Sequence, residues 1–434
     1  DGAYEQNVQF SLYNMMSGRK HMKGTNGNFT GMSGRELKTI TQEIQMPLKS
    51  RNLKIDQSNT AVVFGELLFL KIYRKLDEGI NPELEMMHFL GEKVCFTHIP
   101  PFAGALQYKK SKSETYTIAI LQGYVENSGN AWTLFSGFVS RFFEQVLSSD
   151  YRGTLSTDTF IPLVNISSVN VPPVLTDMVG ELFMELITLL GRRTAEMHIA
   201  LCQQVSMPEF SPEPFTQLYQ RSLFQSMQGL VLRTFGELEK HKKNVPKEFL
   251  DDVETVLELK GQVIDSLRRI VKKKISSLKI RIHGDYHLGQ VLYTGKDFII
   301  MDFEGEPARP LSERKLKRSP FMDVAGMIRS FHYVAYSTLF QKTTFRETDL
   351  PVLEAWISPW YHYISGLFLN SYLQTANAAP FIPSNTNDVT TLIQTYLLEK
   401  AVYELGYEMN NRPDWLLIPL RSIESLIKNI SKNK

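Results

Sequence analysis

Hydrophobic and polar residues alternate with a short period through the N-terminal part of the chain. Apolar residues spaced three and four apart predict a helix over 4–18, and alternation around an Asn-Gly pair predicts a hairpin over 19–32. Two strand-like runs joined near Gly65 occupy 53–75, and 115–125 has the pattern of a central strand followed by a connector. This part of the chain is therefore predicted to form a small, β-rich unit.

The pattern becomes helical after the connector. Apolar residues at helical spacing predict helices over 131–147 and 171–205, the second opened by prolines. Long amphipathic helices continue over 214–275 with one break at Asn244-Val245-Pro246, and a basic loop followed by a helix is predicted over 308–336. The chain is therefore assigned to the α+β class. The predicted organisation is a partial N-terminal cap or lead-in region at 1–50, a small β-rich lobe at 51–125 and a large, mostly helical lobe at 126–434.

Composition and charge limit the classes of function. A chain of 434 residues can bury a large core and is expected to form two lobes, since single cores stop growing beyond roughly 250–300 residues. The 48 basic and 46 acidic side chains leave a formal charge of +2. Such a balance argues against a nucleic-acid-binding or membrane-surface protein.

Cysteine content and apolar runs favour a cytoplasmic protein. Cys95 and Cys202 fit a reduced compartment and form neither a disulfide framework nor a metal motif. No apolar run is long enough to span a bilayer, and no signal peptide is recognisable. Because the chain opens on Asp1 instead of methionine, we expect it to be a fragment or a processed form.

The chemically most suggestive residues lie in two neighbouring motifs, HGDYHLGQ at 283–290 and MDFEGE at 301–306. Between them, two short apolar runs flank a turn, which predicts a β-hairpin. Pairing back from the turn places Gln290 opposite Met301. The amide of Gln290 and the carboxylate of Asp302 are therefore expected to meet at the open end of the hairpin.

This spacing resembles the phosphotransfer machinery of the protein-kinase-like fold. In that machinery Asp285 accepts the proton of the attacking hydroxyl, while Gln290 and Asp302 hold magnesium against the phosphates of the donor nucleotide. Generic kinases have Asn in place of Gln290 and Gly in place of Glu304, and the Glu304 carboxylate either joins the metal shell or caps the loop. The alternative is a buried hairpin with chance acidic residues, which the joint spacing disfavours.

A lysine inside an apolar strand marks the expected nucleotide site. Lys71 lies within LFLKIY, where a charge is rarely buried without a partner or ligand; the alternative is a lysine that extends from an edge strand to solvent. In kinases such a lysine contacts the α- and β-phosphates and is held by a glutamate of the next helix. Asn81-Pro82 opens that helix, and we expect Glu85 to be the partner because Glu83 is placed to complement the helix dipole.

Two further segments are predicted to contact the nucleotide. A polar turn at the tip of the first strand-like run offers backbone N–H groups and hydroxyls to phosphates, although it lacks the glycines of a kinase loop and an ordinary polar turn is the alternative. The connector after the central strand is expected to present backbone groups to a purine. The turn consists of Gln57, Ser58, Asn59 and Thr60, and the hinge candidates are Gln122, Gly123, Tyr124 and Val125.

The helix predicted after the catalytic hairpin carries two candidate residues. Asp323 lies near its N-terminus, where it either caps the helix or orients the catalytic loop. Arg329 can make bidentate hydrogen bonds to diol oxygens or phosphate and is the better candidate for ligand binding. His198, on an earlier helix, is expected to be a core or near-surface histidine and not a catalyst.

Aromatic and polar residues form one stripe along a helix near the C-terminus. Their spacings of three and four place them on the same face. Such a stripe suits a carbohydrate, whose C–H faces rest on rings while its hydroxyls need paired donors and acceptors; a solvent-facing amphipathic helix is the alternative. The stripe consists of Lys400, Tyr403, Glu404, Tyr407 and Asn411.

Four segments together resemble the bacterial maltokinases, which have a two-lobed, aminoglycoside-phosphotransferase-like kinase fold. The segments are IDQSNTAVVFGELLFLKIYRKLDEGINPELE, HGDYHLGQVL, IIMDFEGEPARPLSERKLKRSPFMDVAGMIRSF and EKAVYELGYEMNNRPDWLLIPL. Gln290 and Glu304, which depart from generic kinases, match the pattern of this family. One departure is at the N-terminus, where maltokinases have a cap that precedes the region present in this chain.

The resemblance implies a kinase that uses ATP and magnesium to phosphorylate the anomeric hydroxyl of maltose. It implies Asp285 as the base, Gln290 and Asp302 as metal ligands and Lys71 as a phosphate contact. Maltokinases occur free or fused behind trehalose synthase, so that enzyme is the expected fused or associated partner. The residues implied to bound the sugar pocket are His287, which is also counted with the catalytic group, Arg329, Lys400, Tyr403, Glu404 and Tyr407.

Two other classes of function remain open. A kinase of another sugar, an aminoglycoside or choline would keep the nucleotide residues and change the C-terminal pocket. A strongly acidic pocket would favour a cationic acceptor, and the mixed C-terminal stripe does not have that character. A non-catalytic domain that regulates a fused glycosyl enzyme would be indicated by loss of Asp285, Asp302 or Lys71, and all three are present.

Overall fold

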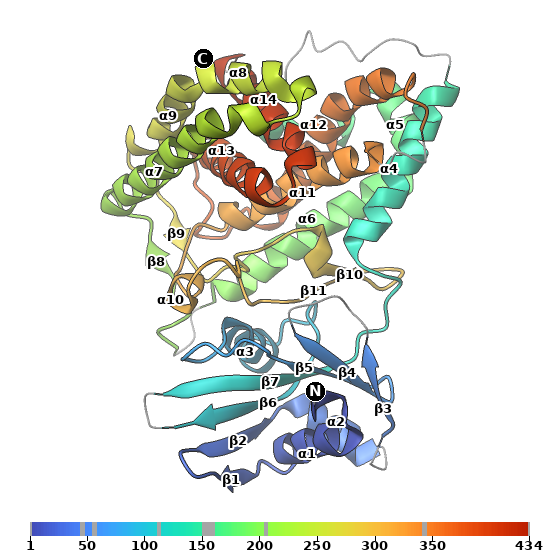
Figure 1. Cartoon of the computed structure of the whole chain (residues 1–434), viewed down its shortest axis with the longest axis vertical. Coiled ribbons are helices and arrows are strands. Elements are labelled where there is room, and N and C mark those ends of the chain that lie inside the picture. The colour runs from blue at the N-terminus through green and yellow to red at the C-terminus, as the bar shows by residue number, and fades with distance from the viewer. Residues whose placement is uncertain are drawn as a thin grey trace.

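The chain folds into two lobes, one built around a β-sheet and one mostly helical (Figure 1). The computed structural model describes residues 2–43, 48–53, 59–110, 114–149, 161–203, 207–340 and 345–432. The sheet lobe comes from the N-terminal part of the chain, drawn in blue and cyan in Figure 1, and the helical lobe comes from the rest. The predicted α+β fold with a small β-rich lobe and a large helical lobe is confirmed.

The sheet lobe contains a seven-stranded sheet in which every neighbouring pair is antiparallel, in the order β1-β2-β6-β7-β5-β4-β3. The strand predicted as central, β7, is the middle strand of the seven. The strands are β1 (His21–Lys23), β2 (Asn28–Ser33), β3 (Ser50–Leu53), β4 (Thr60–Phe64), β5 (Leu68–Ile72), β6 (Phe102–Lys109) and β7 (Thr115–Gly123).

The described residues up to Ser50 belong to this sheet lobe. The predicted hairpin forms as β1 and β2, and β2 pairs with β6 in the same sheet. The helices α1 (Gln6–Ser17) and α2 (Arg35–Glu43) cover one face of the sheet, where Tyr13 and Leu37 pack against Val62 and Phe64. Helix α1 passes so close to β2 that a Cβ on Gly31 would lie 1.9 Å from a backbone oxygen, so this position requires glycine.

The other face of the sheet carries the residues of the cleft. Successive side chains of a strand point to opposite faces, so Leu70 packs toward α1 and α2 while Lys71 points toward helix α3 (Pro82–His88). Asn81 caps α3, because its side chain accepts a hydrogen bond from the Glu83 amide. One turn of π-helix (Phe89–Lys93) continues α3.

The predicted catalytic hairpin is confirmed. It consists of β10 (Val291–Tyr293) and β11 (Phe298–Ile300), and Val291 pairs with Ile300. The Met301 amide donates to the Gln290 carbonyl at 3.0 Å, which places these two residues opposite each other as predicted. In Figure 1 the hairpin lies on the side of the helical lobe that faces the sheet.

The helical lobe surrounds α11, in which almost every side chain is buried. The helix predicted over 171–205 is interrupted by Gly180, whose φ of 83° ends α5 and starts α6. The region 214–275 breaks near 244–246 as predicted, and again after 258. The helices are α4 (Ala131–Ser148), α5 (Pro173–Val179), α6 (Glu181–Leu201), α7 (Gln217–His241), α8 (Leu250–Glu258), α9 (Lys260–Arg268), α10 (Leu311–Arg314), α11 (Phe321–Leu339), α12 (Leu350–Thr375), α13 (Thr386–Asn411) and α14 (Leu417–Lys432).

Short elements complete the described part of the chain. A two-stranded ribbon joins β8 (Glu213–Pro214) to β9 (Leu278–Lys279).

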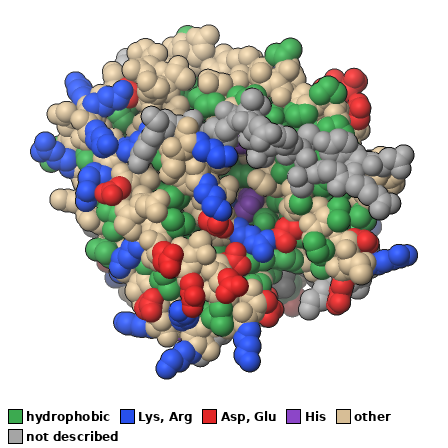
Figure 2. All heavy atoms as spheres, turned by 90° about the horizontal axis from the view of Figure 1, so that it is seen from above, with side chains coloured by type: hydrophobic (Ala, Val, Ile, Leu, Met, Phe, Trp, Pro, Cys, Tyr) green, Lys and Arg blue, Asp and Glu red, His purple; other side chains and the backbone are tan. Residues whose placement is uncertain are grey.

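Within the residues that the structure describes, no helix has the length and apolar character needed to cross a membrane. Figure 2 shows acidic and basic side chains interspersed on the face seen from above, in keeping with the nearly balanced composition.

Candidate active site

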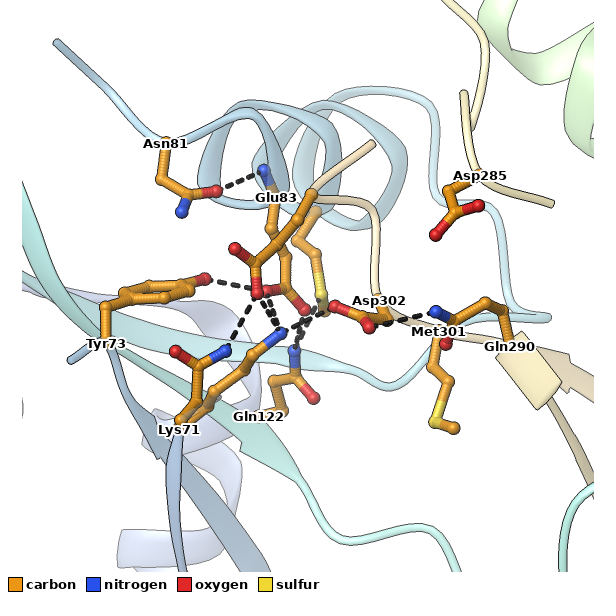
Figure 3. A network of polar contacts seen from close by, with 12 residues as sticks. Lys71, Tyr73, Asn81, Glu83, Gln122, Asp285, Gln290, Met301 and Asp302 are labelled. Carbon is orange, nitrogen blue, oxygen red and sulfur yellow. Dashed lines mark hydrogen bonds and ion pairs between the residues drawn. The ribbon is translucent and has the colours of Figure 1, made fainter. Parts of the chain in front are cut away.

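Lys71 is the centre of a polar network between the lobes (Figure 3). It is 7% exposed, and its Nζ lies 2.8 Å from Glu83 Oε2, 2.6 Å from Asp302 Oδ1 and 2.6 Å from Glu304 Oε1. Burial opposes the charge on the amine, but the three carboxylates outweigh it and raise the pKa of Lys71 well above its ordinary value. Lys71 is therefore a buried cation, and the alternative of a lysine extending to solvent is excluded.

The glutamate that holds Lys71 is Glu83, so the prediction of Glu85 is wrong. Glu83 is 1% exposed and accepts hydrogen bonds from the Tyr73 hydroxyl at 2.6 Å and from Gln122 Nε2 at 3.3 Å. Burial raises the pKa of Glu83, although Lys71 acts to lower it. These partners identify Glu83 as part of the buried network and not merely as a charge that complements the helix dipole.

Glu85 points to the other side of α3. Its carboxylate lies 3.0 Å from Arg281 Nη1 and 2.7 Å from Lys315 Nζ. Successive residues of an α-helix are rotated by about 100°, so Glu83 and Glu85 face nearly opposite directions. The sequence placed both in the first turn of the helix, but the direction of each depends on how α3 lies against the sheet.

Asp302 and Gln290 meet at the open end of the hairpin, as predicted. Gln290 Nε2 donates to Asp302 Oδ2 at 3.1 Å. Asp302 has a φ of 64°, an uncommon left-handed conformation for a residue other than glycine and one associated with functional sites. Burial acts to raise the pKa of Asp302, but the Lys71 cation outweighs it and lowers the pKa below its ordinary value. Asp302 is therefore ionised at neutral pH.

The oxygens around Lys71 fit a magnesium ion. Glu83, Asp302 and Glu304 bring one carboxylate oxygen each within 4.8 Å of one another, and the Gln290 amide is adjacent. Magnesium prefers oxygen ligands and commonly takes only one or two from protein carboxylates. The donor set therefore suits this ion, with Asp302 and Gln290 as the predicted ligands and Glu304 as a further candidate.

The catalytic loop is fixed by Asp323, which confirms that this residue orients the loop. Its carboxylate accepts hydrogen bonds from the backbone amides of His283 at 2.7 Å and Gly284 at 2.9 Å. His198 Nε2 lies 3.1 Å from the same carboxylate, so His198 is a buried core histidine, as predicted. Asp285 follows directly on this anchored segment, and Figure 3 shows it on its loop beside Gln290 and Asp302.

His287 lies next to Asp285 on the same loop. Its Nε2 is 4.0 Å from Asp285 Oδ2, and its Nδ1 accepts a hydrogen bond from the Gly289 amide at 3.0 Å. Desolvation lowers the pKa of His287, although Asp285 acts to raise it. A neutral imidazole is therefore expected beside the catalytic carboxylate.

Two cavities meet at Asp285. One, of about 460 Å³, lies between the lobes and is lined by Lys71, Glu83, Gln122 and Asp302 among others. The other, of about 910 Å³, lies in the helical lobe. Both are lined by Asp285, and the other lining residues that they share are Asn130, His287, Gly289 and Pro307.

The predicted C-terminal stripe lines the larger cavity. Lys400, Tyr403, Glu404 and Tyr407 all reach it from α13, whereas Asn411 is exposed and bonds to the Tyr407 carbonyl. Burial, together with Glu306, raises the pKa of Tyr403, so its phenol stays protonated. The alternative of a stripe that faces only solvent is excluded for these four residues.

The larger cavity has more acidic side chains than the mixed C-terminal stripe by itself indicates. Seven acidic and four basic side chains line it. The stripe is only one wall, and carboxylates from outside it complete the lining. The acidic residues are Asp285, Glu306, Glu313, Asp323, Glu399, Glu404 and Glu408, and the basic ones are Arg233, Arg309, Lys400 and Arg412.

Arg329 does not line the larger cavity in the described structure, which corrects its assignment as a substrate-binding residue. It is completely buried, and its guanidinium bonds to Glu404 at 2.7 and 2.8 Å and to the Ser422 hydroxyl. The Glu404 carboxylate more than offsets the burial of Arg329 and raises the pKa of the guanidinium. Arg329 therefore holds Glu404 at the cavity wall from behind.

The other predicted nucleotide contacts divide into three groups. Gln57 and Ser58 lie outside the described residues. Asn59 lines the interlobe cavity and donates to Glu304 at 3.0 Å, while the buried Thr60 hydroxyl accepts from Arg74. Gln122 lines the cavity, whereas Gly123 and Tyr124 use their amides to bond the carbonyls of Pro101 and Leu67, and the Val125 carbonyl accepts from Asn127. A purine contact at the hinge stays a prediction.

Several residues of the site had no distinct signal in the sequence. The position of Glu83 in the sequence indicates only a residue that complements the helix dipole. Tyr73, which donates a hydrogen bond to Glu83, ends the LFLKIY run without a signal of its own. Glu306 belongs to the DFEGEP segment, where the sequence does not distinguish it from its acidic neighbours. Arg314 lines the interlobe cavity from a segment that looks like an ordinary basic loop. The Asn81 cap shows where α3 starts but does not decide which of its two glutamates faces Lys71.

The two-lobed fold and this site are those of a kinase-like phosphotransferase: a buried lysine–glutamate pair, the carboxylate predicted to bind metal and the aspartate predicted to act as the base share one cleft. No protein-family model matches the chain. The sequence is 24% identical over 386 residues to a glucosamine kinase from Streptacidiphilus jiangxiensis, covering 87% of this chain and 73% of that protein. It is 20% identical over 406 residues to a glucosamine kinase from Mycolicibacterium smegmatis, covering 92% of this chain and 83% of that protein.

A solved structure has the same fold. A glucosamine kinase in complex with glucosamine, ADP and inorganic phosphate superimposes with a TM-score of 0.64 at 19% identity, covering 98% of this chain and 83% of that one. This likeness establishes the kinase-like fold. The resemblance to maltokinases, and with it maltose and trehalose synthase, stays a prediction.

Proposed function

We propose that this protein transfers the γ-phosphoryl group of ATP to a hydroxyl of a small amino sugar, with glucosamine as the first candidate acceptor. The observation that carries the proposal is the position of Asp285 where the two cavities meet. A nucleotide in the interlobe cavity and a sugar in the larger one would face each other across this carboxylate. The names of the two relatives, both glucosamine kinases, support the same acceptor.

In this reaction the protein would position the two reactants and neutralise the charge of the donor phosphates. Asp285 would take the proton of the attacking hydroxyl, and Lys71 would neutralise donor phosphates. Magnesium, when bound at Asp302 and Gln290, would supply further positive charge against those phosphates. Asp323 keeps the Asp285 loop in place, so the base is oriented before the acceptor arrives.

The charge of the acceptor cavity favours a cation over a neutral sugar. Seven acidic side chains face four basic ones there. Glucosamine is an amine and is protonated to a large extent near neutral pH, so its ammonium group would find partners among these carboxylates. Glu404, fixed by Arg329, is a candidate for this contact. Hydrogen bonds to charged groups contribute about 1.5–3 kcal/mol, which corresponds to roughly tenfold to hundredfold in affinity.

Maltose, which the resemblance to maltokinases implies, is the second candidate. The cavity volume of about 910 Å³ admits a disaccharide. Its walls offer aromatic rings at Tyr403 and Tyr407 for the C–H faces of a second sugar ring. The two candidates differ in charge, so an acceptor panel separates them.

The test is phosphate transfer from Mg-ATP to glucosamine, N-acetylglucosamine, glucose and maltose, with the product identified by mass spectrometry. Glucosamine should exceed glucose and N-acetylglucosamine in kcat/KM by about tenfold or more, because only glucosamine carries the cation. Equal rates for glucosamine and glucose would contradict the proposed preference of the cavity for a cationic acceptor. A clear preference for maltose would establish the second candidate instead.

Asp285→Asn provides the catalytic arm of the test. A positioned base contributes typically 10²–10⁴-fold, so kcat should fall by at least about a hundredfold. The Kd for Mg-ADP, measured by calorimetry, should stay near the wild-type value because the amide keeps the shape of the side chain. A variant with nearly wild-type turnover would show that another group takes the proton.

A further inference from the structure

The helix that carries Glu83 is held from its other side by the helical lobe. Glu85 bridges two cations, with Oε2 at 3.0 Å from Arg281 Nη1 and Oε1 at 2.7 Å from Lys315 Nζ. Arg281 leads into the catalytic loop and is 3% exposed, and Lys315 directly follows α10. One carboxylate of the sheet lobe is therefore held by two cations of the helical lobe.

An aromatic stack lies under the same contact. The Arg281 guanidinium lies 5.1 Å from the ring centre of Phe210, and Phe210 stacks on Phe89 with ring centres 3.8 Å apart and planes 2° from parallel. Phe89 directly follows α3, whereas Phe210 belongs to the helical lobe. Both rings are buried, so the charges of Glu85 and Arg281 meet beside an apolar contact.

Arg314, the residue before Lys315, makes a second contact between the two lobes. Arg314 Nη2 lies 2.5 Å from Asp77 Oδ2 in the loop that leads into α3, and Arg314 Nη1 donates to the Glu304 carbonyl at 3.4 Å. In the same loop, a Cβ on Gly79 would lie 2.6 Å from the Leu311 side chain. The segment 311–315 therefore touches both the start of α3 and the loop that carries the metal-binding carboxylates.

We propose that Glu85, Arg281 and Lys315 form an interlobe clasp that sets the rotation of α3 and so holds Glu83 against Lys71. The inference rests on the proposed function, in which Lys71 contacts the donor phosphates. Helix α3 is only seven residues long, and its two glutamates point to opposite sides, one to Lys71 and one to the clasp. Releasing the clasp frees the helix to turn, which separates Glu83 from Lys71 and leaves the lysine to its two other carboxylates. Glu85 and Lys315 are thus positioning residues for nucleotide binding.

The test compares Lys315→Met with Lys317→Met. Lys317 is a matched control, since its Nζ bonds to Glu213 at 2.9 Å and to the Pro208 carbonyl at 2.8 Å, both within the helical lobe. Lys315→Met should raise the Kd of Mg-ADP and the KM of ATP by about three- to fivefold, with the acceptor KM unchanged. Lys315→Arg should restore both values, and Lys317→Met should leave them at wild type.

The clasp is overturned if Lys315→Met leaves the Kd of Mg-ADP unchanged, or if Lys317→Met raises it equally. Glu85→Gln provides a second variant; because it leaves the buried Arg281 less well paired, its folding is checked by circular dichroism. Wild-type protein that binds Mg-ADP but phosphorylates no amino sugar contradicts the proposed acceptor alone. Wild-type protein that binds no Mg-ADP overturns both proposals.

Discussion

Lys71 is the cation with which three carboxylates of the interlobe cleft are paired. Its single ammonium group is ion-paired with three carboxylates, Glu83, Asp302 and Glu304, of which Glu83 is the most deeply buried. Donor phosphates that approach Lys71 would compete with Asp302 and Glu304, which are also the oxygens best suited to magnesium. Metal and nucleotide binding should therefore be coupled through this lysine.

Lys71→Met should destabilise the protein in a pH-dependent way. Removing one partner of a buried ion pair costs roughly 3–5 kcal/mol. Burial already raises the pKa of Glu83 above its usual 4.5, and loss of Lys71 raises it further. Between the unfolded and the folded pKa the native state binds more protons than the unfolded state, so stability increases as the pH falls. The deficit in Tm relative to wild type should shrink from about pH 8 toward about pH 5.

Thermal unfolding across this pH range, followed by circular dichroism, provides the measurement. The double variant Lys71→Met, Glu83→Gln is the control, because a glutamine at that position has no proton to gain and the part of the extra pH dependence that comes from Glu83 should disappear. Parallel Tm curves for Lys71→Met and wild type would show that Glu83 does not titrate in the folded variant.

At the scale of elements, α11 and the catalytic loop act as one unit. Asp323 stands in the first turn of α11 and accepts two backbone hydrogen bonds from the loop, while Ser330, further along the helix, accepts one from the Leu288 amide. His198 of α6 supports Asp323 in turn. The position of Asp285, the proposed base, is thus set by contacts with the core of the helical lobe.

Asp323→Asn should lower kcat strongly while preserving nucleotide binding. An amide can accept only one of the two loop hydrogen bonds well, and a small displacement of a base can cost about a hundredfold in rate. Single-turnover kinetics would measure the loss, with the Kd of Mg-ADP expected near wild type. Ser330→Ala removes one neutral hydrogen bond and should cost less. An equal loss in both variants would contradict a special role for the carboxylate.

At the scale of the whole molecule, the proposed nucleotide site is divided between the lobes. Lys71 and Glu83 come from the sheet lobe, whereas Asp285, Gln290 and Asp302 come from the helical lobe. A ligand bound in the cleft therefore contacts both lobes and should oppose their separation during unfolding.

Mg-ADP should accordingly raise the Tm of the whole chain. A ligand at a hundred times its Kd stabilises the folded state by about 2.7 kcal/mol. EDTA should remove most of this gain if magnesium bridges Asp302 and the phosphates, and Asp302→Ala should lose it even with magnesium present. Scanning calorimetry would measure the shift. An equal rise in Tm with and without magnesium would place the ion elsewhere.

Local sequence was sufficient for the features whose partners are near in the chain. The hairpin and the meeting of Gln290 with Asp302 follow from a period of two on either side of a turn, so short-range pairing alone sets them. Lys71 was recognisable because a charge inside an apolar strand is rarely buried without a partner. The same holds for the C-terminal stripe, whose helical spacing brings four of its five residues to one cavity.

Features whose partners are distant in the chain could be identified only from the tertiary structure. Which face of α3 meets Lys71 is decided by how the helix packs between the two lobes, where Glu83 reaches Lys71 and Glu85 faces the helical lobe, and no local pattern encodes that packing. Arg329 has the chemistry of a ligand-binding residue but lies on the buried side of α11, where Glu404 from α13 neutralises it. The acidity of the acceptor cavity arises because segments far apart in the chain each supply one wall, and charges add only after folding has brought those walls together.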